Sequence, residues 1–295
     1  MATDNAPAYF IVACMGHSAS SWLSEMLSRH PEIVCSHAYE PPPFSIAGDH
    51  AASPADEPLI EAQRRLDAAK HRIQTLPLDK LFEELRCYAE ARAYGNAHMH
   101  NLRSLQTSAQ RFPPSASIKV ANLIRHPVSW IDSRTGNFAA QLTRSASAVR
   151  EFNANYASHQ NDLGPIVAEY GLDLRAPEIL AFLAAVTHLG GLVADALAWQ
   201  DMWFVKMEDL TTDRESFAHF VQEITAGTVT ADAQYLDSIF AAGKRNAHSR
   251  NSGLAAERRY ASWTDWQRRA YGLMSQKFHI PEIYGKLGYD LGFVE

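Results

Sequence analysis

Residues 15–23 combine small residues, hydroxyl groups and a histidine in a pattern suited to binding an anion. They follow an apolar run, Tyr9 to Cys14, that reads as a buried parallel strand, and they lead into apolar residues at helical spacing. A loop between a strand and a helix directs backbone N–H groups and the positive end of the helix dipole toward one point. We therefore expect a phosphate-binding loop formed by Gly16, His17, Ser18, Ala19, Ser20, Ser21 and Trp22. No Gly-Lys-Ser/Thr follows this loop, so the pattern argues against an ordinary ATPase or GTPase.

A second segment has the same organisation. Residues 118–124 read as another buried strand, which ends at Arg125, and Pro127 suits the first turn of a following helix. Arg125 would then lie at the carboxyl end of a strand, where open α/β sheets bind ligands. Ser133 would lie about 9 Å along the axis of that helix. A guanidinium and a hydroxyl group in this arrangement can converge on one phosphate.

Together these residues resemble the sulfotransferase family that uses 3′-phosphoadenosine 5′-phosphosulfate (PAPS). That family has a loop of the form Lys/Arg-Ser-Gly-Thr-Thr-x-Leu after its first strand, which Ser18, Ser20, Ser21 and Leu23 match. It also has an Arg-x-Pro motif followed by a serine for the 3′-phosphate, which Arg125, Pro127 and Ser133 match. Further similarities extend the resemblance over nearly the whole chain: His30-Pro31, the segment 205–210, Trp263-Thr264 and the segment 287–289.

The resemblance implies PAPS as co-substrate, 3′-phosphoadenosine 5′-phosphate (PAP) as product, and no metal. In the loop, His17 stands at the position of the family's basic residue and Ala19 at the position of its glycine. His17 is therefore the candidate that donates a proton or positive charge to the leaving phosphate. Lys244 and Arg245 lie where the family often places a basic loop against the 3′-phosphate, with Arg250, Arg258 and Arg259 as alternatives.

The general base has several candidates. In the carbohydrate-acting branch of the family a catalytic Glu follows the second strand, and this region of the chain holds His37 and Glu40. In cytosolic sulfotransferases a histidine after the insertion is the base, and His98 or His100 occupies that region. Each of these groups could accept a proton from an acceptor hydroxyl. The sequence does not choose among His37, Glu40 and His98.

Composition limits the class of protein. The 295-residue chain is 46% hydrophobic and 20% charged, which is typical of a soluble globular enzyme, and its net charge of −6 does not favour nucleic-acid binding. Three scattered cysteines form neither a disulfide framework nor a zinc motif, and Cys14 and Cys35 are expected in the core. No signal peptide is expected at the N-terminus, and the apolar stretch 177–199 is expected to be a core helix, so we expect a cytoplasmic protein with no membrane partner.

Alternating strands and helices predict an α/β fold with a central parallel sheet. The resemblance refines this prediction to a three-layer sandwich with the P-loop-like sulfotransferase fold, as a single domain over 1–295. We expect strands near 9–14, 32–36, 117–125 and 202–207, a helical insertion at about 45–95 with helices near 55–75 and 79–93, and a helical region at about 139–200 that breaks near Gly164-Pro165 and Pro177. Further helices are expected near 19–30, 213–225, 231–241 and 264–279.

The sequence therefore predicts a sulfotransferase that moves a sulfuryl group from PAPS to a hydroxyl or amine of a small molecule or sugar. Two alternatives remain. One is a noncatalytic PAP- or nucleotide-binding relative, and the other is a different transfer or elimination reaction on a phosphorylated substrate. Neither the acceptor nor the oligomeric state can be predicted from the sequence.

Overall fold

In the part of the chain that the structure describes, five parallel strands form the central sheet, in the order β2-β3-β1-β4-β5. The strands are β1 (Ala8–Cys14), β2 (Ile33–His37), β3 (Ala93–His98), β4 (Ile118–Ile124) and β5 (Trp203–Lys206). All four pairings are parallel, so the carboxyl ends of the strands meet at one edge of the sheet. This arrangement confirms the predicted α/β class with a central parallel sheet.

The computed structural model describes residues 6–14, 19–37, 78–98, 102–110, 118–199, 202–241 and 255–294. The chain divides into two compact units. The first, called the sheet unit here, comprises Met1–Ile124 and Trp199–Arg245, and the second, the helical unit, comprises Arg125–Ala198 and Asn246–Glu295. The expectation of one domain over 1–295 stays a prediction.

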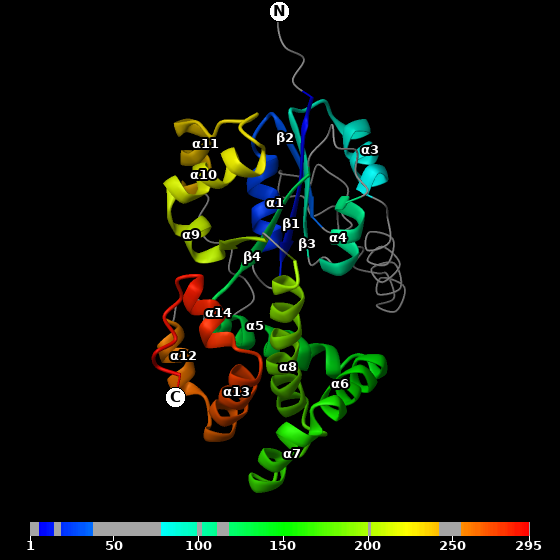
Figure 1. Cartoon of the computed structure of the whole chain (residues 1–295), viewed down its shortest axis with the longest axis vertical. Helices are drawn as coiled ribbons and strands as arrows, with labels where there is room; N and C mark the ends of the chain where they lie inside the picture. Colours follow the sequence, from blue (N-terminus) through cyan, green and yellow to red (C-terminus); the bar gives the residue numbers. More distant parts are fainter. Residues whose placement is uncertain are drawn as a thin grey trace, which may run out of the picture. The chain divides into compact units, whose positions relative to one another are not determined.

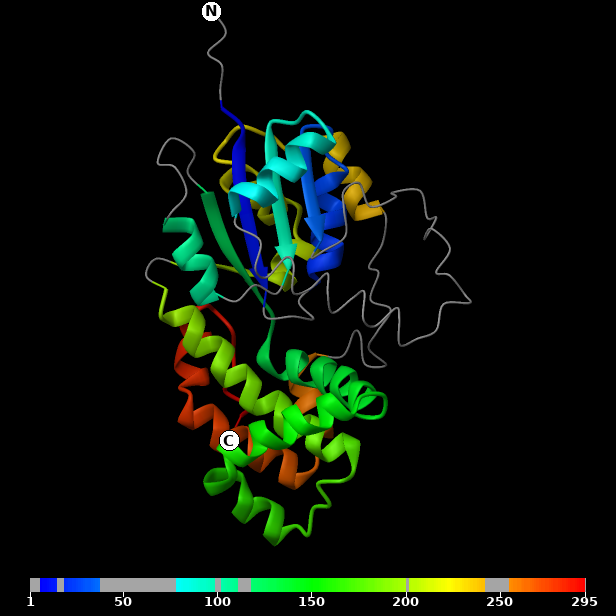
Figure 2. The same cartoon turned by 90° about the vertical axis from the view of Figure 1, so that its right-hand side faces the viewer.

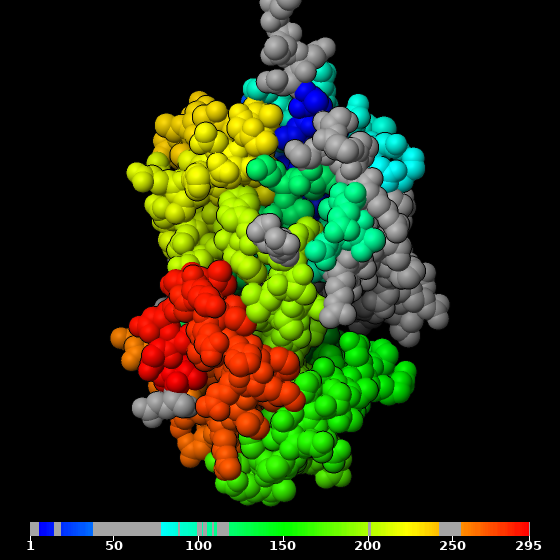
Figure 3. Space-filling view, in the orientation of Figure 1, coloured from blue at the N-terminus to red at the C-terminus, as the bar shows by residue number. Residues whose placement is uncertain are grey.

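Helices cover both faces of the sheet, which gives the sheet unit three layers (Figure 1). One face carries α1 (Ser20–Ser28), α10 (Arg214–Ile224) and α11 (Ala233–Ala241). The outer surfaces of α10 and α11 are visible in yellow and gold in Figure 3. The other face carries α3 (Leu78–Tyr88) and α4 (Leu102–Gln110), seen in front of and beside the strands in Figure 2. The short helix α9 (Met207–Thr212) follows β5 directly and has Glu208 and Asp209 in its first turn.

The apolar core of the sheet unit lies between the sheet and α1, α10 and α11. All seven residues of β1 are buried, because the strand lies inside the sheet and helices cover both of its faces. Cys14 and Cys35 belong to this core, as predicted. On the opposite face the ring of Tyr9 packs 4.8 Å from that of Phe82 on α3.

The sequence did not predict β3. The expected helix near 79–93 ends at Tyr88, and residues 93–98 form a strand between β1 and β2, where the helical insertion was expected to continue. Gly95 and Asn96 have low strand propensity, which hid this strand. Gly95 is nevertheless required there, because a Cβ atom at this position would lie 2.0 Å from Cε2 of the Phe10 ring on β1.

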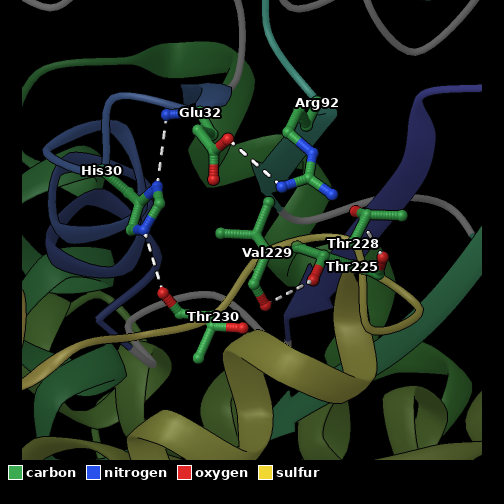
Figure 4. Close-up of polar contacts among 7 residues, drawn as sticks. All are labelled: His30, Glu32, Arg92, Thr225, Thr228, Val229 and Thr230. Carbon is green, nitrogen blue, oxygen red and sulfur yellow. Dashed lines mark hydrogen bonds and ion pairs between the residues drawn. The ribbon is translucent and has the colours of Figure 1, made fainter. Parts of the chain in front are cut away.

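A group of polar contacts fixes the C-terminal end of α1 (Figure 4). The Nδ1 atom of His30 accepts a hydrogen bond from the backbone N–H of Glu32, so Nε2 carries the proton and donates to the carbonyl of Thr230 at 3.2 Å. Glu32 also pairs with Arg92 at 3.3 Å, next to the start of β3. His30 therefore connects α1 and β2 to the segment between α10 and α11. These contacts hold α1 in place from the end opposite to its N-terminus.

The helical unit contains seven described helices: α5 (Pro127–Leu142), α6 (Ala146–Ser158), α7 (Gln160–Glu169), α8 (Pro177–Leu197), α12 (Ala256–Ser262), α13 (Asp265–Lys277) and α14 (Ile280–Lys286). Helix α8 is long and apolar enough to cross a membrane by length and composition, but 67% of its most apolar window is buried inside the protein. Helices α5, α6 and α13 pack against it, in accord with the predicted core helix. The predicted break at Gly164-Pro165 is wrong, because Pro165 lies inside α7. The interruptions fall at residues 143–145, at His159 and between Tyr170 and Ala176, and the last of these agrees with the predicted break near Pro177.

Candidate functional site

The direction in which successive strands are added to the sheet reverses beside β1. The chain passes from β1 through α1 to β2 at one edge, returns to β3 beside β1, and then continues through α4 to β4 on the other side of β1. The helices that follow β1 and β3 consequently lie on opposite faces of the sheet (Figure 1). Open α/β sheets bind their ligands at this point of their topology, outside the carboxyl ends of the strands. The search for a site therefore begins at the ends of β1, β2 and β3.

The N-terminus of α1 lies at this edge and is suited to an anion. Ala19 precedes the helix with φ 59° and ψ 27°, and the first intrahelical bond runs from the N–H of Leu23 to the carbonyl of Ala19. Among the described residues no side chain caps this terminus, and its first turn has no acidic residue. The first-turn N–H groups have no intrahelical acceptor, so they are directed toward a ligand position. The hydroxyls of Ser20 and Ser21 add donors, and this set of neutral donors fits a phosphate or sulfate group.

His37 lies at the end of β2, against the first turn of α1. Its Nε2 atom is 3.2 Å from Oγ of Ser20 and 3.3 Å from Oγ of Ser21. Burial lowers the pKa of the imidazole to about 4. His37 is therefore neutral at physiological pH, which is the form that can accept a proton.

His98, the last residue of β3, lies beside His37. The two rings meet edge to face, with centroids 5.4 Å apart and an interplanar angle of 83°. Strand register explains the contact, because His37 pairs with Ala97 and brings the ends of β2 and β3 together. The structure thus unites two of the predicted base candidates, His37 and His98, with the predicted ligands Ser20 and Ser21.

A buried polar pair lies behind the two histidines and was not predicted from the sequence. The Nδ2 group of Asn96 on β3 donates to Oγ of Ser36 on β2 at 2.7 Å, and Ser36 in turn donates to the carbonyl of Gly95 at 3.5 Å. Ser36 and Asn96 are 3% and 0% exposed, so the pair is held away from water and ties the two strands together directly before His37 and His98. Polar residues inside two apolar strands were the available signal for this pair.

Trp22 and the arginine motif have other surroundings. The ring of Trp22 is half-buried on α1 and packs edge to face on Phe217 of α10, with centroids 5.9 Å apart. Arg125 and Ser133 belong to the helical unit, where Arg125 follows β4 directly and Ser133 lies on α5 after Pro127, as predicted.

Asp132, next to Ser133, accepts a 2.6 Å hydrogen bond from Nε1 of Trp263. Its other carboxylate oxygen lies 3.6 Å from Nη1 of Arg259, a residue that is only 2% exposed. These contacts fix α12 to α5 next to Ser133. The remaining predicted site residues lie outside the described residues: Gly16, His17, Ser18, Glu40, His100, Lys244 and Arg245.

Comparisons with known proteins found similar solved structures. No protein-family profile and no curated protein matches the chain. A sulfotransferase domain from the Synechococcus PCC 7002 olefin synthase aligns at 14% identity and a TM-score of 0.44, over 99% of this chain and 98% of that chain. A sulfotransferase from Alicyclobacillus acidocaldarius aligns at 15% identity and a TM-score of 0.40, over 92% of this chain and 96% of that chain. A sulfotransferase domain from the curacin biosynthetic pathway aligns at 12% identity and a TM-score of 0.38, over 93% and 98% of the two chains.

Proposed function

We propose that this protein is a PAPS-dependent sulfotransferase acting on a hydroxyl or amine of a small molecule or sugar. The observation that carries the proposal is the N-terminus of α1, which presents Ser20, Ser21 and the first-turn N–H groups next to the neutral imidazole of His37. An anion-binding terminus beside a proton acceptor is what sulfuryl transfer to a hydroxyl requires. A noncatalytic nucleotide-binding protein would have no need for the proton acceptor His37.

Each residue has a role in this proposal. The first-turn N–H groups and the hydroxyls of Ser20 and Ser21 bind the 5′-phosphosulfate group of the donor. His37 accepts the proton of the acceptor hydroxyl at Nε2, and His98 keeps the His37 ring in place through its edge-to-face contact. Bound at this terminus, the donor supplies the sulfuryl group and leaves as PAP. By resemblance to the family, Arg125 and Ser133 would bind the 3′-phosphate of the donor.

The family resemblance supplies the other roles, and they are part of the same proposal. His17 would neutralise the leaving phosphate, and Lys244 and Arg245 would bind the 3′-phosphate. A cytoplasmic location also belongs to the proposal.

Ligand preference tests the donor. Thermal unfolding would be followed with PAP, adenosine 5′-phosphosulfate and ATP, since a ligand that binds the native state raises its melting temperature. We expect PAP to give the largest rise, because only PAP carries a 3′-phosphate. Arg125→Ala should weaken PAP binding by about 1.5–3 kcal/mol, the scale of a hydrogen bond to a charged group. Equal shifts for PAP and ATP would contradict the proposal.

Turnover tests the base. With PAPS and a panel of phenols, sugars and amines, we expect His37→Gln to lose about 100-fold or more in turnover while PAP binding stays intact. His219→Gln is the matched control, because His219 is exposed on α10. Near-parental turnover of the His37 variant, with His98→Gln strongly impaired instead, would move the role of base to His98.

A further inference from the structure

Two serine hydroxyls share a single nitrogen atom of His37. Ser20 and Ser21 place their Oγ atoms 3.2 Å and 3.3 Å from the same Nε2. Which atom donates in these two contacts depends on the tautomer of His37. In the tautomer with its proton on Nδ1, which we assign to the donor-free protein as part of this inference, Nε2 has one lone pair and both hydroxyls address that one acceptor position. An acceptor hydroxyl that is to give its proton to His37 needs this same lone pair. In the described structure the candidate base is therefore already engaged by side chains of α1.

The same two hydroxyls lie where the helix terminus favours an anion. Ser20 and Ser21 are the first two residues of α1, and their backbone N–H groups have no intrahelical acceptor. A serine hydroxyl has one proton to donate. It can donate that proton to Nε2 of His37 or to an anionic oxygen at the terminus, but not to both. A hydrogen bond to a charged oxygen is stronger than one to a neutral acceptor, so a bound anion takes the hydroxyls.

We propose that Ser20 and Ser21 are positioning residues that occupy Nε2 of His37 in the donor-free protein and release it when their hydroxyls turn to the donor. This inference rests on the proposed function and adds an order of events to it. His37 becomes an open proton acceptor only after the donor has bound, so the donor binds productively before the acceptor. The contacts that do not involve the serines hold the ring meanwhile: His98 packs edge to face on it, and the Ser36–Asn96 pair fixes the strands behind it.

Nitrogen NMR of the histidine side chains tests the release without any turnover. The protein is labelled with ¹⁵N at its histidines, and the His37 signals are assigned from the spectrum of His37→Gln. PAP is then added at neutral pH. We expect the His37 Nε2 resonance of the parent to move toward the value of an unprotonated nitrogen without a hydrogen bond. In Ser20→Ala/Ser21→Ala we expect this resonance near that value before PAP is added, with little further movement.

Ser28→Ala is the matched control, since Ser28 lies on the same helix and donates to the carbonyl of Cys35 at 2.7 Å, away from His37. Its His37 resonance should respond to PAP as in the parent. Calorimetry with PAP separates the two proposals. No binding of PAP to the parent would refute the proposed function itself. Binding of PAP with an unchanged His37 resonance, with equal movement in the parent and the double variant, or with movement to the protonated value, would overturn the release of His37 and leave the donor site standing.

Discussion

Acid should destabilise this protein through His188, a buried histidine of α8. Its ring stacks on Trp130 of α5 with an interplanar angle of 2° and meets Phe138 edge to face. Burial, together with the positive charge of Arg134, lowers the pKa of His188 from 6.5 to about 4. Between these two values the unfolded chain binds a proton that the native protein does not bind. Stability contributed by the neutral ring is therefore present at neutral pH and is lost as the pH falls from about 6.5 toward 4.

The size of the effect follows from the two pKa values. With 6.5 in the unfolded chain and about 4 in the native protein, proton linkage lowers the free energy of unfolding by about 2 kcal/mol between pH 7 and pH 5. His188→Phe keeps an aromatic ring against Trp130 and removes the titrating group. We expect the variant to lose about 2 kcal/mol less than the parent over this interval. At pH 8, where His188 is neutral in both states, the variant should be at least as stable as the parent, because Nε2 of His188 is a buried atom without a hydrogen-bond partner among the described residues.

Urea unfolding at pH 8, 7, 6 and 5 measures the difference, followed both by circular dichroism and by tryptophan fluorescence. Coincident transitions in the two signals are required, since the chain has two compact units that could unfold separately. His37 shifts in the same direction, also to about 4, and remains in both proteins, so it cancels in the comparison. Parallel pH dependence of the parent and His188→Phe would refute the reasoning, because the two proteins differ in this interval only by the titration of His188.

Three further substitutions test packing and charge. Gly95→Ala should lower the free energy of unfolding by about 2 kcal/mol or more, because its Cβ would lie 2.0 Å from the Phe10 ring. Gly136→Ala on α5 should raise it by about 0.5–1 kcal/mol, because among the described residues no atom beyond the adjacent backbone of α5 lies within 4 Å of the new Cβ. Urea unfolding of both variants checks this pair, and a Gly95 variant as stable as the parent would contradict the close contact. Asp132→Asn should cost about 3 kcal/mol, because it removes a negative charge that lies 3.6 Å from the buried Arg259 guanidinium. A loss below about 1 kcal/mol in the same assay would show that this ion pair is not needed for stability.

Periodicity sufficed for the elements that are apolar throughout or that have strong boundary residues. The strands β1, β4 and β5 and the helices α8, α10, α11 and α13 were predicted to within a few residues. For α8 the proline at its first position and its apolar composition both indicated a core helix. These signals are local, so one sequence is enough to read them.

The failures had tertiary causes. β3 contains Gly95 and Asn96, whose presence is explained by the Phe10 ring across the sheet and by Ser36 on the neighbouring strand. Pro165 was expected to break a helix, but inside α7 it removes only a single backbone donor. Neither Phe10 nor Ser36 can be recognised as a partner of β3 from the sequence around that strand.

The site was predicted in part for the same reason. The loop motif indicated Ser20 and Ser21, and position along the chain indicated His37 and His98 as alternatives. Their meeting depends on the sheet order, which places β3 between β1 and β2. The low pKa of His37 depends on burial, which no spacing in the sequence reports.

Ala19 stores conformational strain at the N-terminal end of α1. A left-handed backbone at φ 59° costs an alanine roughly 1 kcal/mol, whereas a glycine would adopt it freely. Contacts elsewhere in the fold must therefore maintain this conformation. An anion bound to the first-turn N–H groups would favour the same conformation and would offset part of its cost. A protein with glycine at this position would fold with less strain but from a more flexible unfolded chain.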